Sequence, residues 1–275
     1  MDSYYVLGNP VEHSKSPWIH ARFAELTGQA MRYGKRLAPL DGFAATVREL
    51  RAEGARGCNV TVPFKFEAHG VATELSPRAR LAGACNTLRF DGDAIHGDNT
   101  DGVGLVDDIV RNAGVELAGA QVLLVGAGGA AAGVLGPLLE ARPARIVVVN
   151  RTVGKANELV AHHRALAQAQ GVTLEVEPIE AVREPFDVVV NATAASLSGA
   201  AVPVAPSVLR AGALAYDMMY GPAAAGFAAW ASEHGAVARD GLGMLVEQAA
   251  ESFFVWRGVR PPAAQVLGEL RATLG

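Results

Sequence analysis

The chain of 275 residues is poor in cysteine, and its basic residues are outnumbered by acidic ones. Cys58 and Cys85 are its two cysteines, so no disulfide framework is expected and a reducing compartment, the cytoplasm, is expected instead. Lys and Arg total 24 against 28 Asp and Glu, which gives a net charge of −4. This balance offers no basic surface for nucleic acid and no polybasic run for an acidic membrane, so neither is an expected partner.

The chain also lacks an uninterrupted apolar run that would suit a membrane helix. Residues 118–139 and 188–209 carry no charge and are long enough to cross a bilayer, but glycine and proline interrupt both. A helix broken in this way would leave backbone groups without partners in lipid. The first residues lack the basic start and the apolar core of a signal peptide, so we expect mature sequence and no membrane partner.

Half of the residues are hydrophobic and 19% are charged, which indicates a globular protein with an ample core. The first hundred residues alternate short apolar strands with helical patterns, which predicts a small α/β domain. Ser16 is expected to cap a helix that has Pro17 at its first position, and a hairpin is expected around Gly92-Asp93. Strands are expected at 4–8, 32–37, 57–63, 88–91 and 94–97, and helices at 17–26, 43–53 and from Lys65 onward.

A second series of strands and helices begins near Gly119, with strands that are apolar on both faces, as a buried parallel sheet requires. Strands are expected at 121–125, 145–150, 174–178, 188–191 and 213–216, and helices after the first strand, at 155–171 and at 244–256. The chain is therefore predicted to fold as two α/β domains, with the boundary in a helix over 102–113.

A glycine-rich turn directly follows the strand expected at 121–125. Residues 126–131, GAGGAA, fit G-x-G-x-x-A, the small-residue form of the dinucleotide fingerprint. Glycine permits the tight turn and the close approach of a pyrophosphate, and the N-terminus of the following helix favours the anion. A tight turn without a ligand is the alternative, but the strand before it, the helix after it and a second strand at the expected distance favour a nucleotide.

The end of the second strand indicates which dinucleotide to expect. Sites for NAD have a carboxylate there to bind the ribose 2′-hydroxyl, whereas this chain has Asn150-Arg151-Thr152 with Lys155 close by. A guanidinium can bind a 2′-phosphate through two hydrogen bonds and stack on adenine. We therefore expect NADP(H); the alternative is that Arg151 is a solvated loop charge.

Four polar segments stand out in the apolar first half, at 14–17, 59–65, 86–87 and 98–102. Asn59, Thr61 and Lys65 occupy a strand end and the turn after it, which is where α/β sheets bind ligands, so they are candidates to bind a small polyhydroxylated molecule. Taken singly, Lys65 also suits a solvated helix start, Asp101 a first-turn acid and Asn86 a turn cap.

Together these motifs resemble the shikimate dehydrogenase family over essentially the full length of the chain. The residues that carry the resemblance are SKSP at 14–17, NVTVPFK at 59–65, GACNT at 83–87, DNTDG at 98–102, GAGGA at 126–130, NRT at 150–152 and GLGMLVEQA at 241–249. The resemblance implies an NADP-dependent oxidoreductase of the shikimate pathway, which reduces 3-dehydroshikimate to shikimate reversibly. It also implies a substrate-binding domain at 1–102, to which a helical segment at 242–275 returns, a Rossmann-type NADP-binding domain at 103–241, and a cleft between the two.

The resemblance further assigns roles to individual residues. It implies Lys65 and Asp101 as the catalytic pair, in which a cation stabilises the negative charge that hydride delivery builds on a ketone oxygen. The implied substrate ligands are Ser14, Ser16 and Tyr220 for the carboxylate, and Asn59, Thr61, Asn86 and Gln248 for the ring hydroxyls and the reacting oxygen. The implied cofactor ligands are Gly126, Ala127, Gly128, Gly129, Ala130, Asn150, Arg151, Thr152, Lys155 and Thr193, with Met218 and Gly241 at the nicotinamide.

Two positions depart from the family pattern. Thr193 is followed by Ala194-Ala195-Ser196, where the family commonly has serines and a glycine, so contacts on the nicotinamide side are expected to differ. Lys155 stands where a second arginine is frequent, and its point charge is expected to reduce selectivity for the 2′-phosphate.

Two other functions remain as alternatives. One is a quinate/shikimate dehydrogenase that uses NAD, against which Arg151 and the missing strand-end acid argue. The other is a non-catalytic module that senses shikimate or nucleotide, against which the intact Lys65 and Asp101 argue.

The seven histidines show no metal-ligand spacing with cysteine or carboxylates, so no metal is expected. His162 and His163 are expected on a helix surface, and Cys58 and Cys85 as small buried residues. The protein is expected to act as a monomer or a homodimer.

Overall fold

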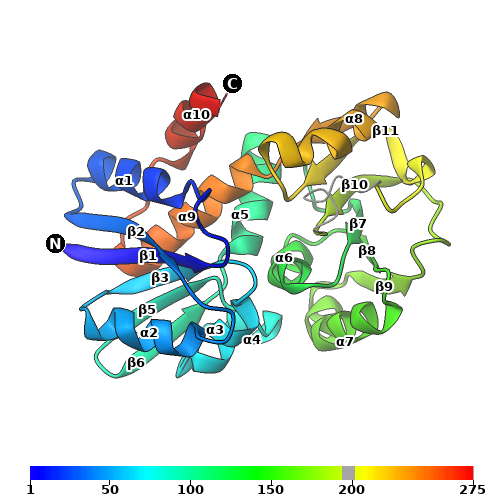
Figure 1. Cartoon of the computed structure of the whole chain (residues 1–275). Helices are drawn as coiled ribbons and strands as arrows, with labels where there is room; N and C mark the ends of the chain where they lie inside the picture. Colours follow the sequence, from blue (N-terminus) through cyan, green and yellow to red (C-terminus); the bar gives the residue numbers. More distant parts are fainter. Residues whose placement is uncertain (194–201, 275) are drawn as a thin grey trace. The chain divides into compact units, whose positions relative to one another are not determined.

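The computed structural model describes residues 1–193 and 202–274, and this part of the chain divides into two units (Figure 1). The first unit combines residues 1–104 with the chain from 246 onward, and the second spans residues 105–245. Each unit is an α/β domain with its own sheet, as the alternation of strands and helices predicts.

The first unit is built on six described strands in the order β2-β1-β3-β5-β6-β4. Their bounds are β1 (Asp2–Gly8), β2 (Met31–Leu37), β3 (Gly57–Val60), β4 (Glu74–Leu75), β5 (Thr87–Asp91) and β6 (Ala94–Asp98). Strand β1 runs parallel to β2 and β3, whereas β5 is antiparallel to β3 and β6. Asp91 lies opposite Ala94, which confirms the hairpin predicted around Gly92-Asp93.

Helices cover both faces of this sheet. Alternation along β1 sends Leu7 to one face, where α2 (Phe43–Ala52), α3 (Lys65–Val71) and α4 (Pro77–Ala82) close a core that includes both cysteines. Tyr4 points to the other face and stacks on Trp256 of α9 (Leu242–Arg257), with ring centroids 4.6 Å apart. On that side α1 (Ser16–Thr27) contributes the buried Phe23, and α10 (Ala263–Leu274) contacts α1.

The start of α1 corrects one prediction. Lys15, not Ser16, occupies the N-cap position, and Ser16 is the first helical residue. The Ser16 amide instead donates to Oγ of Ser14 at 3.3 Å, so the hydroxyl that accepts a hydrogen bond near the helix start comes from Ser14.

The second unit is built on six described strands that all run parallel. They are β7 (Gln121–Val125), β8 (Arg145–Val149), β9 (Thr173–Glu177), β10 (Phe186–Asn191), β11 (Leu209–Asp217) and β12 (Val237–Arg239). Their order, β9-β8-β7-β10-β11-β12, is the 3-2-1-4-5-6 order of dinucleotide-binding sheets. The short β12 has no counterpart among the predicted strands.

Both faces of this second sheet are buried. Val122 and Leu124 of β7 face a core shared with α6 (Gly129–Glu140) and α7 (Val153–Gln170), which lie side by side in Figure 1. Leu123 and Val125 face the opposite core, where α8 (Ala225–Glu233) packs. This burial explains why the strands are apolar without alternation.

The remaining described elements are short. They are α5 (Asp101–Asp107), the π-helical turn η1 (Asp108–Asn112), and the 3₁₀ turns η3 (Pro206–Val208) and η4 (Gly221–Ala224).

The two uncharged stretches of the sequence do not form long helices. Residues 118–139 contain β7, the glycine turn and most of α6, while 188–209 contain the end of β10 and η3, with 194–201 outside the described residues. Within residues 1–193 and 202–274, no helix is both long enough and apolar enough to cross a membrane.

The expected surface position of His163 is wrong. His163 lies on α7 but is 1% exposed, with Nδ1 2.8 Å from the carbonyl oxygen of Leu159. Only its neighbour His162 is exposed, because adjacent helical residues point about 100° apart.

Candidate active site

The predicted catalytic pair forms in the first unit. Lys65 begins α3 and Asp101 begins α5, and Lys65 Nζ lies 2.5 Å from Asp101 Oδ2. The lysine side chain is 19% exposed and the aspartate 7%, so the pair is largely shielded from solvent. The alternative predictions for the two residues taken singly also hold, because Lys65 lies at the start of a helix and Asp101 in the first turn of another. The ion pair joins these two helix starts.

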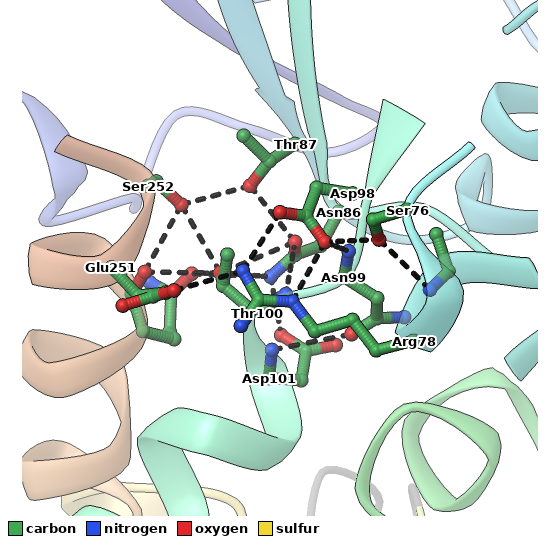
Figure 2. Close-up of polar contacts among 12 residues, drawn as sticks. Ser76, Arg78, Asn86, Thr87, Asp98, Asn99, Thr100, Asp101, Glu251 and Ser252 are labelled. Carbon is green, nitrogen blue, oxygen red and sulfur yellow. Dashed lines mark hydrogen bonds and ion pairs between the residues drawn. The ribbon is translucent and has the colours of Figure 1, made fainter. Parts of the chain in front are cut away.

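Asn86 holds the second oxygen of Asp101. Its Nδ2 donates to Asp101 Oδ1 at 2.8 Å, and its Oδ1 accepts from the Thr100 amide at 2.9 Å (Figure 2). The same Nδ2 lies 3.3 Å from Oε1 of Gln248 on α9. Both carboxylate oxygens of Asp101 therefore have donors, which fixes the rotamer that faces Lys65.

A cluster of three buried hydroxyls, Thr87, Thr100 and Ser252, supports Asn86. Ser252 Oγ lies 2.8 Å from Thr87 Oγ1 and 3.1 Å from Thr100 Oγ1, and both threonine hydroxyls donate to Asn86 Oδ1. Asn59 also donates to Ser252 Oγ, at 2.9 Å, and accepts from the Tyr33 hydroxyl at 2.7 Å. The structure thus places the Asn59 amide inside this network, at 6% exposure.

Ser252 is a site residue that the sequence analysis missed. The available signal was its spacing, because Ser252 follows Gln248 by four residues on α9 and so lies on the same helix face. Its hydroxyl donates to the Gln248 carbonyl oxygen at 3.0 Å.

Replacing Ser252 by alanine is expected to lower the free energy of unfolding by about 1–3 kcal/mol, because the Asn59 amide loses a buried acceptor. Urea denaturation of the two proteins measures this difference. Ser232→Ala, at an exposed position of α8, is the matched control and is expected to change stability by less than about 0.5 kcal/mol. Equal stability of Ser252→Ala and the wild type would contradict the supporting role of the hydroxyl cluster.

An ionic clamp holds the turn that leads into Asp101. Arg78 on α4 binds both oxygens of Asp98 at 2.7 Å and also donates to Glu251 of α9 at 2.9 Å (Figure 2). Burial alone would raise the pKa of Asp98, but the hydrogen bonds and charge of Arg78, with the Ser76 hydroxyl, bring that pKa below its usual range. An ionised Asp98 then accepts the Asn99 amide at 2.7 Å and fixes the turn.

The remaining predicted substrate ligands lie at three places in the two units. Ser14 and Ser16 lie at the start of α1, where a side-chain hydrogen bond links Ser16 to Tyr33, the partner of Asn59, and Thr61 follows β3 with its amide bonded to the Leu7 carbonyl at 2.8 Å. Tyr220 belongs to the second unit, where burial raises the pKa of its phenol and keeps it neutral.

The carboxyl ends of the parallel strands form the candidate cofactor site. Gly126, directly after β7, has φ +118°, and a Cβ there would lie 3.1 Å from the Ala192 carbonyl oxygen, so the turn requires glycine. Ala192 donates its amide to the Val125 carbonyl oxygen at 2.8 Å, which holds the segment after β10 against this turn. Thr193 is fixed there by its hydroxyl, which donates to Asn191 Oδ1 at 2.7 Å.

The start of α6 is suited to an anion. The helix begins at Gly129 with Gly128 as N-cap, and neither a side-chain cap nor a first-turn acid occurs there among the described residues. Ala127 and Ala130 flank this start and are both partly exposed. Their small side chains leave the backbone amides accessible. A pyrophosphate fits this backbone, because the N-terminal amides of a helix attract negative charge.

The end of β8 is suited to a second anion. Arg151, Thr152 and Lys155 are exposed there, and Asn150 Nδ2 donates to the Thr152 carbonyl oxygen at 2.9 Å, which orders the turn. The first turn of α7 contains no acidic residue. These two cations match a 2′-phosphate, as the sequence predicts.

Two further strand ends contact each other near this site. The Gly241 amide donates to the Met219 carbonyl oxygen at 2.8 Å, and a Cβ on Gly241 would lie 2.3 Å from the Met218 carbonyl oxygen. Only glycine permits this approach. The family departure at Ala194-Ala195-Ser196 lies outside the described residues.

Comparison with known proteins decides the family. Residues 6–88 match the model of the shikimate dehydrogenase substrate binding domain, 108–199 that of shikimate / quinate 5-dehydrogenase, and 241–271 that of the shikimate 5′-dehydrogenase C-terminal domain. The chain is 64% identical over 273 residues to shikimate dehydrogenase (NADP(+)) of Acidovorax sp. (strain JS42), covering 99% of this chain and 97% of that protein. The chain belongs to the shikimate dehydrogenase family.

Solved structures of similar proteins agree with this assignment. Shikimate 5-dehydrogenase from Thermus thermophilus in complex with NADP(H) and shikimate has a TM-score of 0.86 and 31% identity, covering 100% of both chains. The Ael1 enzyme from Pseudomonas putida has a TM-score of 0.89 and 43% identity, covering 98% of both chains. The predicted family and the α/β architecture with two domains are confirmed.

Proposed function

We propose that this shikimate dehydrogenase family member catalyses the reversible, NADPH-dependent reduction of 3-dehydroshikimate to shikimate, in the pathway to chorismate and the aromatic amino acids. It is an NADP-dependent oxidoreductase that acts on a CH–OH group, as its relatives named shikimate dehydrogenase (NADP(+)) are. The observation that carries the proposal is the contact of 2.5 Å between Lys65 and Asp101. A protein that only senses a ligand does not need this pair.

The residues of the first unit supply the proton and the position of the substrate. Bound NADPH supplies the hydride that reaches the carbonyl carbon. The ammonium of Lys65 stabilises the charge that develops on the carbonyl oxygen and donates the proton that completes the hydroxyl. Asp101 holds the ammonium by its ion pair, Asn86 fixes Asp101 from the other side, and Gln248 offers an amide nearby for a neighbouring hydroxyl. In the reverse direction Lys65 accepts the hydroxyl proton.

Initial rates of cofactor reduction, with shikimate or quinate paired with NADP⁺ or NAD⁺, test the proposal. We expect turnover of shikimate with NADP⁺ and little with NAD⁺. Comparable turnover with NAD⁺, or oxidation of quinate, would support the broader dehydrogenase instead. Absence of turnover in all four pairs, with retained ligand binding, would support the sensing module.

Replacing Arg151 by alanine is expected to raise the KM for NADP⁺ by about tenfold to a hundredfold, and to leave the KM for NAD⁺ within about twofold. A charge-assisted hydrogen bond contributes about 1.5–3 kcal/mol, and NAD⁺ has no 2′-phosphate to lose. Arg164→Ala removes another exposed arginine, on α7, and is expected to change neither constant. A parallel rise of both constants in Arg151→Ala would contradict recognition of the 2′-phosphate.

The proposal also covers the compartment and the oligomeric state of the enzyme. Two buried free thiols, Cys58 and Cys85, support a reducing compartment such as the cytoplasm. We propose that the enzyme acts there as a monomer or a homodimer, which light scattering after size-exclusion chromatography distinguishes.

A further inference from the structure

Asp108 is a fully buried carboxylate in the second unit that the proposed reaction does not use. It is the first residue of the π-helical turn η1, and its exposure is 0%. An ionised carboxylate removed from water is costly unless other groups bind it. Turns of π-helix inside helices occur often at functional sites, so the partners of Asp108 are informative.

Three other side chains bind this carboxylate. Arg239 donates from Nε to Oδ2 at 2.8 Å and from Nη2 to Oδ1 at 2.6 Å. The Tyr216 hydroxyl donates to Oδ2 at 2.7 Å, and Asn112 Nδ2 donates to Oδ1 at 2.9 Å. Burial alone would raise the pKa of Asp108, but these donors, led by Arg239, bring that pKa below its usual range. Asp108 is therefore an anion that joins two strands to η1.

The two strand residues precede the segments assigned to the nicotinamide. Tyr216 lies on β11, two residues before Met218, and Arg239 ends β12, two residues before Gly241. Met218 is in turn held by its amide, which donates to the Asn191 carbonyl oxygen at 3.1 Å. The approach of Gly241 to the Met218 carbonyl leaves no room for a side chain. A shift of either strand end thus displaces both segments together.

The first turn of α9 packs on the same carboxylate. A Cβ on Gly243 would lie 1.8 Å from Asp108 Oδ1, so the helix backbone touches the carboxylate directly. Asp108 is consequently held by β11, β12, η1 and α9. Together these contacts fix the position of the Asp108 carboxylate closely.

We propose that Asp108 is a positioning residue for the nicotinamide end of the cofactor: through Tyr216 and Arg239 it sets the strand ends that carry Met218 and Gly241. The inference rests on the proposed function and on the family resemblance, which implies that Met218 and Gly241 lie at that end. It predicts that loss of the Asp108 charge disturbs the reacting ring and leaves the adenosine end, at Gly126 and Arg151, intact. A misplacement of about 1 Å at the reacting ring costs up to about a hundredfold in rate.

The test uses Asp108→Asn and Tyr216→Phe in the full-length enzyme. Tyr216→Phe removes one hydrogen bond and retains the ring and the Asp108–Arg239 pair, so we expect it to fold even if Asp108→Asn does not. Two quantities are measured: kcat for shikimate oxidation with NADP⁺, and the Kd of adenosine 2′,5′-bisphosphate, which contains only the adenosine end. We expect kcat to fall about tenfold to a hundredfold in Asp108→Asn and less in Tyr216→Phe, with that Kd unchanged within about twofold.

A kinetic isotope effect adds a readout that a merely structural role would not change. With shikimate deuterated at the oxidised carbon, a displaced nicotinamide slows the hydride step, so the isotope effect on kcat is expected to rise in both variants. Glu175→Gln is the matched control, because Glu175 also pairs with an arginine, Arg145, at 2.6 Å but on β9 and β8. We expect it to retain kcat, the isotope effect and the Kd.

Two outcomes would overturn the proposal. Equal weakening of adenosine 2′,5′-bisphosphate binding and of kcat would show that Asp108 supports the whole unit, and unchanged kcat in both variants would show that it positions nothing. Failure of the proposed function gives a different result, because the wild-type enzyme itself would then not oxidise shikimate with NADP⁺.

Discussion

Lys65→Met is expected to lower kcat for shikimate oxidation by about a thousandfold and to leave shikimate binding within about threefold. General acid–base catalysis by a positioned side chain contributes about 10²–10⁴-fold, and Lys65 is also the cation that meets the developing oxyanion. Methionine keeps the length of the chain and its packing but has neither charge nor proton. Steady-state rates of shikimate oxidation with NADP⁺ give kcat for the variant and the wild type. Isothermal titration calorimetry with shikimate gives the Kd of each protein.

Two comparisons make the Lys65 result specific. Lys35→Met removes an exposed lysine of β2 by the same substitution and is expected to keep wild-type kcat. The double variant Lys65→Met with Asp101→Asn is expected to be no slower than Lys65→Met alone, because residues that act as one unit are not additive. A Lys65→Met enzyme that turned over within tenfold of the wild type would remove Lys65 from the reaction.

Much of the candidate cofactor site could be predicted because its residues directly follow strands. Gly126 follows β7 and Arg151 follows β8, each within two residues of an apolar run, so a pattern that locates the strand also locates the residue. Parallel strands bring their carboxyl ends to one edge, where α/β sheets bind ligands. The strand pattern alone therefore predicts which residues gather at the edge, although it gives no distances.

The supporting residues could not be predicted in the same way. Ser252 has only its four-residue spacing from Gln248 as a signal, and Asp108 lies in an acidic pair that does not distinguish it from a surface aspartate. Their roles come from partners far along the chain: Ser252 contacts Asn59, and Asp108 contacts Arg239. Such contacts depend on the packed fold, and a local pattern contains no information about them.

The wrong predictions have the same origin. Ser16 satisfied the local rule for a helix cap, but Ser14 two residues earlier is the hydroxyl that accepts the amide. The sequence analysis predicts both His162 and His163 on a helix surface, whereas the 3.6-residue period of α7 turns His163 inward. In both cases the geometry of a single turn decided between two adjacent or nearly adjacent residues.

One histidine, His20, is expected to lower the stability of the enzyme by about 2 kcal/mol between pH 7 and pH 5. His20 lies on α1 with 0% exposure and stacks on Tyr33 with ring centroids 4.2 Å apart. Burial lowers the pKa of His20 from its ordinary value of 6.5 to about 3, and neither ring nitrogen has a hydrogen-bond partner within the described part of the chain. The folded protein therefore keeps this imidazole neutral at a pH where the unfolded chain protonates it.

The sign of the effect follows from proton binding. Below pH 6.5 the unfolded chain binds one proton more at His20 than the folded protein, so protonation favours unfolding. The contribution fades out above pH 6.5, approaches a slope of about 1.4 kcal/mol for each pH unit below it, and levels off near the folded pKa of about 3. Stability is thus lost as pH falls, the opposite of a histidine that gains an acidic partner.

His20→Leu is expected to remove this part of the pH dependence while retaining an apolar side chain in the aromatic cluster of Phe23, Tyr33 and Phe253. Urea denaturation at pH 7, 6 and 5 gives the free energy of unfolding of each protein. The decrease from pH 7 to pH 5 should be about 2 kcal/mol smaller in His20→Leu than in the wild type, whereas His13→Leu, at an exposed position of the same unit, should keep the wild-type dependence. The prediction fails if the free energy of unfolding falls as much from pH 7 to pH 5 in His20→Leu as in the wild type. The folded protein would then protonate His20 as readily as the unfolded chain does. That result is incompatible with a ring buried away from water between Tyr33 and the aromatic side chains of α9.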